Sequence, residues 1–245
     1  MSKTNISKLL KLAEQGDTKA QYELGEYFLN QEKHPANAFQ WYFLAAQKGH
    51  VEAQCAVADL LSTGLGVEKN EEEAAKWYLK AAESGSAHAQ CWLGSMYFDG
   101  TGVPRDYNTA IKWYRKAADQ DNFFGLYNMG CVYLNGDGVE IDYARAFEFF
   151  MRASEVDPHD SIVFGDIGYL YEMGYGTPQS MTKAIEYYLL AANLGDSDSA
   201  FNLGDCYEEG RGVEKNLEEA LKWYQIAAEY GNESAQKKVQ ELTCK

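Results

Sequence analysis

The sequence predicts an all-α protein, a stack of about six helical hairpins with a capping helix at each end. Three observations predict this fold class. A Gly-x-Gly stretch recurs with leading glycines Gly64, Gly100, Gly136, Gly174 and Gly210, which are 36, 36, 38 and 36 residues apart. Apolar residues on both sides of the stretch recur at helical spacing. A fixed period of this size is typical of stacked repeats, in which each repeat is one supersecondary unit.

The predicted elements follow one another along the whole chain, which we expect to be a single domain. A first capping helix covers residues 4–15, where Leu9, Leu10 and Ala13 share one face. Repeats are expected at residues 17–49, 50–85, 86–121, 122–157, 158–195 and 196–231. A second capping helix covers residues 232–245. A terminal helix with one polar face lets such a stack end without an open hydrophobic surface.

The third repeat shows how each hairpin is expected to form. Its first helix is apolar along Ala89, Leu93 and Tyr97. Gly100 then suits the left-handed residue that ends a helix, and Asp106 is placed to accept hydrogen bonds from the free N–H groups of the second helix. Gly-x-Gly also occurs in nucleotide-binding loops, but those follow a strand and are needed once. Its recurrence here therefore predicts a turn between two helices.

The second helix of each repeat carries a pair of aromatic residues followed by a pair of small ones. We expect both rings to be buried, because each removes roughly 150–250 Å² from water and needs the following repeat to pack against. A glycine in the first helix, such as Gly94, lets the two helices approach closely. The aromatic pairs are Trp41-Tyr42, Trp77-Tyr78, Trp113-Tyr114, Phe149-Phe150, Tyr187-Tyr188 and Trp223-Tyr224.

This pattern resembles the Sel1-like repeat, a relative of the tetratricopeptide repeat with a longer turn inside the hairpin. The resemblance is carried by Leu93-Gly94-x2-Tyr97 and Ala110-x3-Tyr114-x2-Ala117, and it covers six consecutive units. It implies a right-handed α-α superhelix, or solenoid. For the family it also implies an adaptor role in assembling protein complexes, and it does not imply catalysis. The first unit departs from the pattern, because it lacks the glycine pair and is shorter.

Composition restricts the classes of partner. The net charge of −15 argues against nucleic acid and anionic membranes, because binding them requires clustered Lys and Arg. We expect no signal peptide and no membrane span, and therefore a cytoplasmic protein. The five cysteines are an odd number without a CxxC motif, which favours neither a disulfide framework nor zinc. We expect no metal, no cofactor and a monomer.

The predicted binding surface lies on the first helices of the hairpins, which line the concave side in this class of protein. The residues opposite the packing stripe mix aromatic rings, thiols and carboxylates, a combination that suits a peptide or helix with basic and apolar residues. For the thiols, burial as small side chains is the favoured interpretation. The candidates are Tyr22, Glu26, Cys55, Asp59, Cys91, Ser95, Phe98, Tyr127, Cys131, Tyr169, Glu172, Phe201, Asp205 and Glu208.

An enzymatic function is not expected, because catalysis needs two or three convergent groups. His34, His50, His88 and His159 fall in different repeats and turns. His88 lies one helical turn from Cys91, and we expect it to be solvated or packed. Two functions fit the repeat array. One is an adaptor or scaffold that binds partner proteins; the other is a dedicated neutraliser, such as an immunity protein, that masks a basic enzyme or toxin. Whether the concave or the convex face binds is left open.

Overall fold

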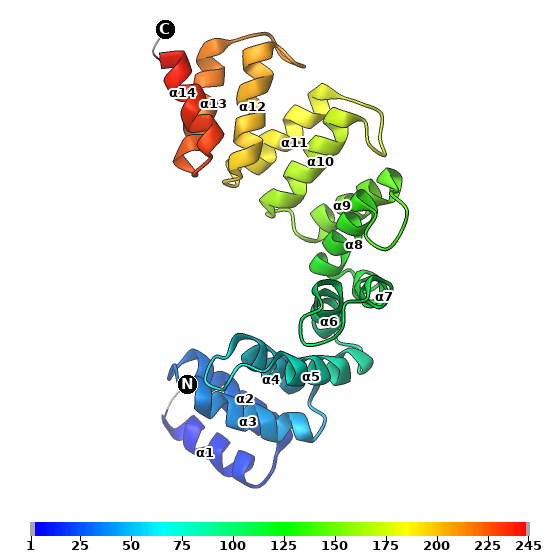
Figure 1. Ribbon diagram of the computed structural model, residues 1–245. Helices are drawn as coiled ribbons and strands as arrows, with labels where there is room; N and C mark the ends of the chain where they lie inside the picture. The colour runs from blue at the N-terminus through cyan, green and yellow to red at the C-terminus, as the bar shows by residue number, and fades with distance from the viewer. Residues whose placement is uncertain (1–2, 244–245) are drawn as a thin grey trace. The chain divides into compact units, whose positions relative to one another are not determined.

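The computed structural model describes residues 3–243, which form fourteen helices and no strand (Figure 1). Residues 244 and 245, which the second predicted capping helix includes, lie outside the described residues. The chain divides into two compact units. The first ends at Gly125 and the second begins at Leu126, a boundary that falls within helix α8 (Phe123–Asn135). Within each unit the elements are helical hairpins arranged in sequence order.

The first unit consists of a lone helix followed by three hairpins. Helices α2 and α3, α4 and α5, and α6 and α7 pack against each other as hairpins, while α3 packs on α4 and α5 on α6. Helix α1 packs on α2. The bounds are α1 Lys3–Glu14, α2 Thr18–Asn30, α3 Pro35–Gln47, α4 Val51–Thr63, α5 Glu71–Glu83, α6 Ala87–Asp99 and α7 Tyr107–Ala118.

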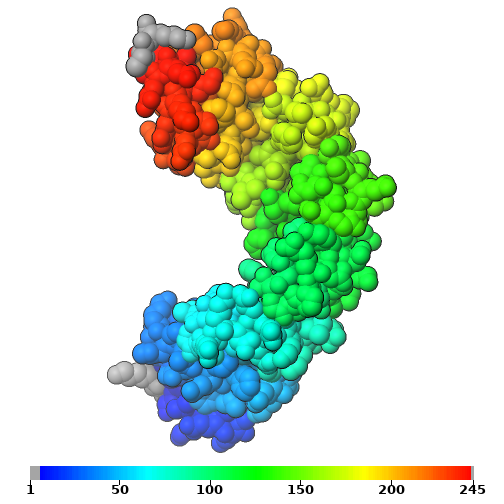
Figure 2. All heavy atoms as spheres, viewed as in Figure 1, coloured from blue at the N-terminus to red at the C-terminus, as the bar shows by residue number. Residues whose placement is uncertain are grey.

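The second unit continues from α8 with the same arrangement and closes on a single helix. Helices α10 and α11, and α12 and α13, form hairpins, α9 packs on α10, and α14 packs on α13. In the space-filling view each hairpin of a unit lies against the hairpin that follows it in the sequence (Figure 2). The bounds are α9 Tyr143–Val156, α10 Ser161–Met173, α11 Met181–Asn193, α12 Ser197–Glu209, α13 Leu217–Glu229 and α14 Glu233–Thr243.

The turn inside the hairpins after the first has the structure that the sequence predicts. In the first hairpin Gln31, which follows the last residue of α2, has a right-handed conformation, and α3 begins without a side-chain cap. Gly100 has a φ of 77° and ends α6 in the left-handed conformation that favours glycine. At the start of α7 the Asp106 carboxylate accepts hydrogen bonds from the N–H groups of Asn108 (3.0 Å) and Thr109 (3.2 Å). The Gly-x-Gly stretch is therefore an interhelical turn followed by a side-chain cap.

The aromatic pairs differ from the prediction, because in most of them only the second ring is buried. Tyr42, Phe150, Tyr188 and Tyr224 are fully buried, and Tyr114 is 4% exposed, whereas Trp113 is half-buried. The second ring faces the glycine of the first helix: a Cβ built on Gly94 would lie 2.7 Å from Cδ1 of Tyr114. The first ring sits about 100° further round the helix, at the edge of the packed face.

Candidate functional site

The fourteen candidate residues all lie on first helices, seven in each unit. Cys55 and Cys91 are largely buried, at 8% and 6% exposure, as favoured for the thiols. Cys131 is half-buried, and Tyr169 is exposed. The structure brings together four of the seven candidates in the first unit: Tyr22, Glu26, Cys55 and Asp59 line one pocket.

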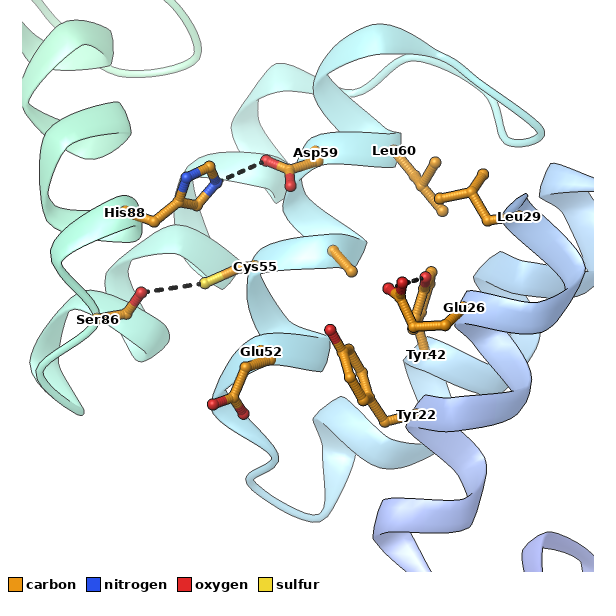
Figure 3. A pocket seen from close by; sticks show the side chains of 11 residues that line it. Tyr22, Glu26, Leu29, Tyr42, Glu52, Cys55, Asp59, Leu60, Ser86 and His88 are labelled. Atoms are coloured by element: carbon orange, nitrogen blue, oxygen red, sulfur yellow. Dashed lines mark hydrogen bonds and ion pairs between the residues drawn. The ribbon is translucent and has the colours of Figure 1, made fainter. Parts of the chain in front are cut away.

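This pocket, which we call the α2–α4 pocket, has a volume of about 310 Å³ and opens between α2, α4 and the start of α6 (Figure 3). Helix α2 supplies one wall and α4 supplies the opposite wall, while α6 adds a third side (Figure 3). Apolar side chains and carboxylates both contribute to the lining. The lining residues are Tyr22, Glu26, Leu29, Tyr42, Glu52, Cys55, Ala56, Asp59, Leu60, Ser86 and His88.

Two carboxylates of the pocket are oriented by tyrosines from second helices. The Tyr42 hydroxyl donates to Oε1 of Glu26 at 2.6 Å, and the Tyr78 hydroxyl donates to Oδ1 of Asp59 at 2.5 Å. Burial, together with the adjacent carboxylates, raises the pKa of both phenols, so they remain protonated donors at neutral pH. From the sequence, these tyrosines were expected only to pack, and their pairing with carboxylates was not predicted.

A signal for these tyrosine–carboxylate pairs was present in the repeats. Glu26 and Asp59 directly follow the small residue of the first helix, and each belongs to a repeat whose second aromatic residue is tyrosine. Where Cys131 stands at that place, the partner ring is Phe150, which has no hydroxyl. Ser95 and Tyr169 stand at that place in the repeats of Tyr114 and Tyr188, so acid and hydroxyl vary together in only four of the six repeats and the signal is partial.

The Tyr22 ring forms an aromatic wall of the pocket. It stacks on His50 with ring centroids 4.7 Å apart and is tilted against Tyr42 at 5.6 Å. Burial and the neighbouring Glu26 raise the pKa of Tyr22 to about 12. The ring is therefore a neutral surface at physiological pH.

The third side of the pocket carries polar groups from the start of α6. His88 Nε2 lies 3.3 Å from Oδ1 of Asp59, and Ser86 Oγ lies 3.4 Å from Sγ of Cys55. His88, which we expected to be solvated or packed, is half-exposed and pairs with this carboxylate. Burial raises the pKa of the Cys55 thiol, which keeps it protonated and poorly nucleophilic.

The remaining candidates of the first unit lie on α6, outside this pocket. Phe98 meets Tyr107 edge to face with ring centroids 5.0 Å apart, and Ser95 Oγ accepts a hydrogen bond from Tyr114 at 3.1 Å. Trp92, which was not predicted as a site residue, is 51% exposed and stacks on Tyr78 with ring centroids 6.4 Å apart. Trp92 precedes the glycine of its helix by two residues, a position that was not among the predicted binding positions.

In the second unit, two candidate carboxylates are already bonded to cations of the same chain. Glu172 accepts from the Tyr188 hydroxyl at 2.7 Å and forms an ion pair with Arg211. Glu208 accepts from the Tyr224 hydroxyl at 2.6 Å and from Lys238 Nζ at 2.7 Å. The bonds from Lys238 and Tyr224 lower the pKa of Glu208. These two carboxylates connect successive elements of the stack.

The other candidates of the second unit lie around buried or stacked groups. Tyr127 and Cys131 neighbour Asp166, whose pKa is raised by burial from 3.8 to about 6, against the hydrogen bond from Tyr127 that lowers it. Phe201 is tilted against Tyr224 at 5.4 Å, and the hydroxyl of that tyrosine also donates to Asp205 at 2.6 Å.

The described residues form neither a metal site nor a membrane-spanning helix. Within residues 3–243, no group of three or more His, Cys, Asp or Glu side chains is arranged to hold a metal ion. Over the same range, no helix combines the length and the apolar character that crossing a membrane requires.

A comparison with family models finds one match, described as the Sel1 repeat. It covers six segments, residues 18–50, 51–86, 87–122, 124–156, 166–196 and 197–232. The predicted resemblance is thereby confirmed. No curated protein matches the chain.

Solved structures with the same fold extend the comparison. The protective antigen c5321 of uropathogenic Escherichia coli, which displays an SLR fold, is 34% identical with a TM-score of 0.88; the match covers 96% of this chain and 50% of that one. This chain thus spans half the length of that antigen. A Sel1 repeat protein from Oxalobacter formigenes is 35% identical with a TM-score of 0.82, covering 89% and 86% of the two chains.

A more distant structure shares the fold alone. The immunity protein Pa5087 from Pseudomonas aeruginosa is 20% identical with a TM-score of 0.51, over 87% of this chain and 81% of that one. Together with the fourteen described helices, the closer matches confirm the predicted fold class, an all-α solenoid of helical hairpins.

Proposed function

Because this chain belongs to the Sel1 repeat family, we propose that it is a non-enzymatic adaptor that binds partner proteins through the first helices of its hairpins. Sel1 repeat proteins are in general scaffolds for protein interactions rather than enzymes. The fourteen candidate residues on these helices form the proposed binding surface. The partner, on this proposal, is a protein with exposed basic and apolar side chains.

The observation that carries the proposal is the open α2–α4 pocket beside an exposed tryptophan. Trp92 is half-exposed on α6, and its neighbour His88 contributes to the pocket lining. Exposed aromatic rings next to a cavity are the usual anchoring points of protein interfaces. The combination of carboxylates and apolar groups in the pocket supports a partner of basic and apolar character.

Site-specific photo-crosslinking tests which face binds. A photoreactive amino acid replaces Trp92 on a first helix or, as the matched control, Leu44 on a second helix, which is 41% exposed. We expect crosslinked partner proteins from position 92 and none from position 44. Adducts from position 44 alone would move the binding surface to the second helices and overturn the proposal.

The neutraliser is the second candidate, and the net charge of −15 is the observation that favours it. On this reading the acidic surface masks one basic enzyme or toxin in a tight complex of fixed stoichiometry. Electrostatically steered association would then slow steeply as salt is raised. Recovery of one partner at a fixed ratio with this salt dependence supports the neutraliser, whereas several weaker partners support the adaptor.

We also propose that the chain acts as a monomer in the cytoplasm. An odd number of cysteines without paired motifs supports a reducing compartment. Light scattering during size-exclusion chromatography tests the monomer, whose mass is 27.5 kDa. A mass near twice this value would show a dimer instead.

A further inference from the structure

We propose that the α2–α4 pocket binds the arginine or lysine side chain of a partner protein, with the cationic group placed between Glu26 and Asp59. This inference rests on the proposed adaptor function, and it names the chemistry by which the partner is recognised. It is drawn from a comparison of the repeats within this chain.

The second unit shows which group a tyrosine–carboxylate pair of this fold binds. On α10, Glu172 accepts from Tyr188 and also pairs with Arg211, which lies in the turn after α12. On α12, Glu208 accepts from Tyr224 and also from Lys238 of α14. In both cases the tyrosine comes from the second helix of the hairpin and the cation from a later element.

The first unit has tyrosine–carboxylate pairs without the cation. Their carboxylates directly follow the small residue of the first helix, whereas Glu172 and Glu208 lie four residues after it. Glu26 accepts from Tyr42 and from Asn30, and Asp59 accepts from Tyr78 and pairs with His88. Among residues 6–243, whose side chains the structure describes, no lysine or arginine forms an ion pair with either carboxylate. Both carboxylates instead line the open pocket of about 310 Å³.

The pocket lining matches the two parts of a long basic side chain. Leu29, Ala56 and Leu60 offer apolar contacts to an aliphatic stem, which arginine and lysine bury readily. The face of Tyr22 can accept the cation through its ring. Figure 3 shows Tyr22 and Glu26 on one side and Asp59 on the other.

The charge of the lining determines the sign of the ligand. Glu26, Glu52 and Asp59 contribute three carboxylates, and His88 is the only basic side chain in the lining. Both bonds of Asp59 engage Oδ1, which leaves Oδ2 available to a new donor. The side chain of Asp59 is 44% exposed and that of Glu52 is 68% exposed, so a ligand can reach both from solvent.

The test titrates the intact protein with argininamide and lysinamide and follows backbone amide chemical shifts. We expect both cations to shift the amides of Tyr22, Cys55 and Ala56, while neutral citrullinamide leaves them unchanged. Asp59→Asn retains an acceptor for Tyr78 and should weaken binding about tenfold, the lower range for hydrogen bonds to charged groups. Ala56→Phe fills the pocket without changing its charge and should abolish binding.

A control variant and the neutral ligand citrullinamide show whether the pocket recognises the charge of its ligand. Glu83→Gln removes one exposed carboxylate of α5 outside the pocket lining, and it should change the affinity by about twofold or less, as expected of a screened charge. If all three variants weaken binding equally, or if citrullinamide binds as well, the pocket does not recognise a cation and the inference is overturned. Thermal melting checks that each variant is folded, and Glu52→Gln replaces Asp59→Asn if that variant is unfolded.

This experiment separates the inference from the proposed function. If the cations fail to bind while crosslinking at position 92 still captures a partner, the adaptor function holds and the pocket assignment is wrong. If the cations bind but crosslinking finds partners only at position 44, the pocket is a cation site and the proposed binding face is wrong.

Discussion

The two units use the same chemical pair for different purposes. In the second unit, Glu172 and Glu208 each hold a tyrosine hydroxyl and a basic side chain of a later element, so both carboxylates are part of the stack itself. In the first unit, Glu26 and Asp59 hold only the hydroxyl and a neighbouring Asn or His, and they line an open pocket.

The carboxylates of the two units occupy different positions of the repeat: Glu26 and Asp59 directly follow the small residue of the first helix, and Glu172 and Glu208 lie four residues after it. Each carboxylate is oriented by its own hairpin, but its second partner is supplied by an element further along the chain. Glu172 and Glu208, which pair with Arg211 and Lys238, stabilise the stack. Glu26 and Asp59 have no such partner among the described side chains and line the pocket instead.

The largest expected effect follows the removal of a buried tyrosine ring, a feature that both units share. Tyr78→Ala in the first unit and Tyr224→Ala in the second should each lower the free energy of unfolding by about 3–5 kcal/mol, because both rings are buried and their removal leaves a cavity. Trp113→Ala should cost clearly less, since its ring is half-buried. Chemical denaturation measures all three. An equal loss for Trp113→Ala would show that the first ring is part of the core after all.

A buried acid of the second unit provides the next test. Burial raises the pKa of Asp166 from 3.8 to about 6, so the folded state holds this proton more tightly than the unfolded chain. The protonated carboxyl contributes stability that is present below pH 4 and is lost as pH rises through 6. At neutral pH the buried, charged carboxylate therefore lowers the free energy of unfolding. Asp166→Asn should therefore raise stability at pH 7 by about 1–3 kcal/mol.

Melting curves between pH 4 and pH 7 check this expectation. The variant should lose the part of the pH dependence that falls between pH 4 and pH 6. Glu155→Gln, at an exposed position of α9, is the matched control and should leave the profile unchanged. A variant that is less stable at pH 7 would mean that the charged carboxylate is favoured where it lies.

The ion pair of the second unit should contribute a smaller amount. Arg211→Met leaves the mostly buried Glu172 without its cation and should lower the free energy of unfolding by about 1–2 kcal/mol. Glu26→Gln in the first unit keeps an acceptor for Tyr42 and should cost about 0–1 kcal/mol. Parallel denaturation of the two variants measures the contrast, and equal losses would remove the distinction between the units.

The smallest expected effect tests whether Glu172 binds a free cation once its own cation is removed. Arg211→Ala removes the cation from Glu172 and should allow argininamide to bind weakly in the second unit. The backbone amides around α10 would then shift in the variant but not in the parent chain. No shift in the variant would mean that the second unit lacks the space that the α2–α4 pocket provides.

Much of the fold was predictable because its signals are local. Gly100 ends α6 and Asp106 caps α7 through atoms a few residues apart, and the hairpins after the first repeat such features. Local patterns could not show that only one ring of most aromatic pairs is buried. Both rings fit a broad apolar stripe, and only the contact of Tyr114 with Gly94 shows which of the two is enclosed.

The candidate site was only partly predictable. The first-helix positions led to Tyr22, Glu26, Cys55 and Asp59, which do line one pocket. Trp92 and the tyrosine hydroxyls were missed, because exposure and hydrogen bonding depend on side-chain directions across two helices. The carboxylates Glu172 and Glu208 were predicted to bind a partner, and the structure gives them partners within the chain.

By itself, the sequence determined the repeated hairpin, its turn and caps, and the family, since these depend on the residue order within about 36 positions. The tertiary structure alone decided which carboxylates are already bonded and which line a pocket. Glu172 and Arg211 are 39 residues apart, and no local pattern fixes whether two side chains at that separation meet. That depends on how one hairpin packs on the next, which places charges from different repeats within reach of each other.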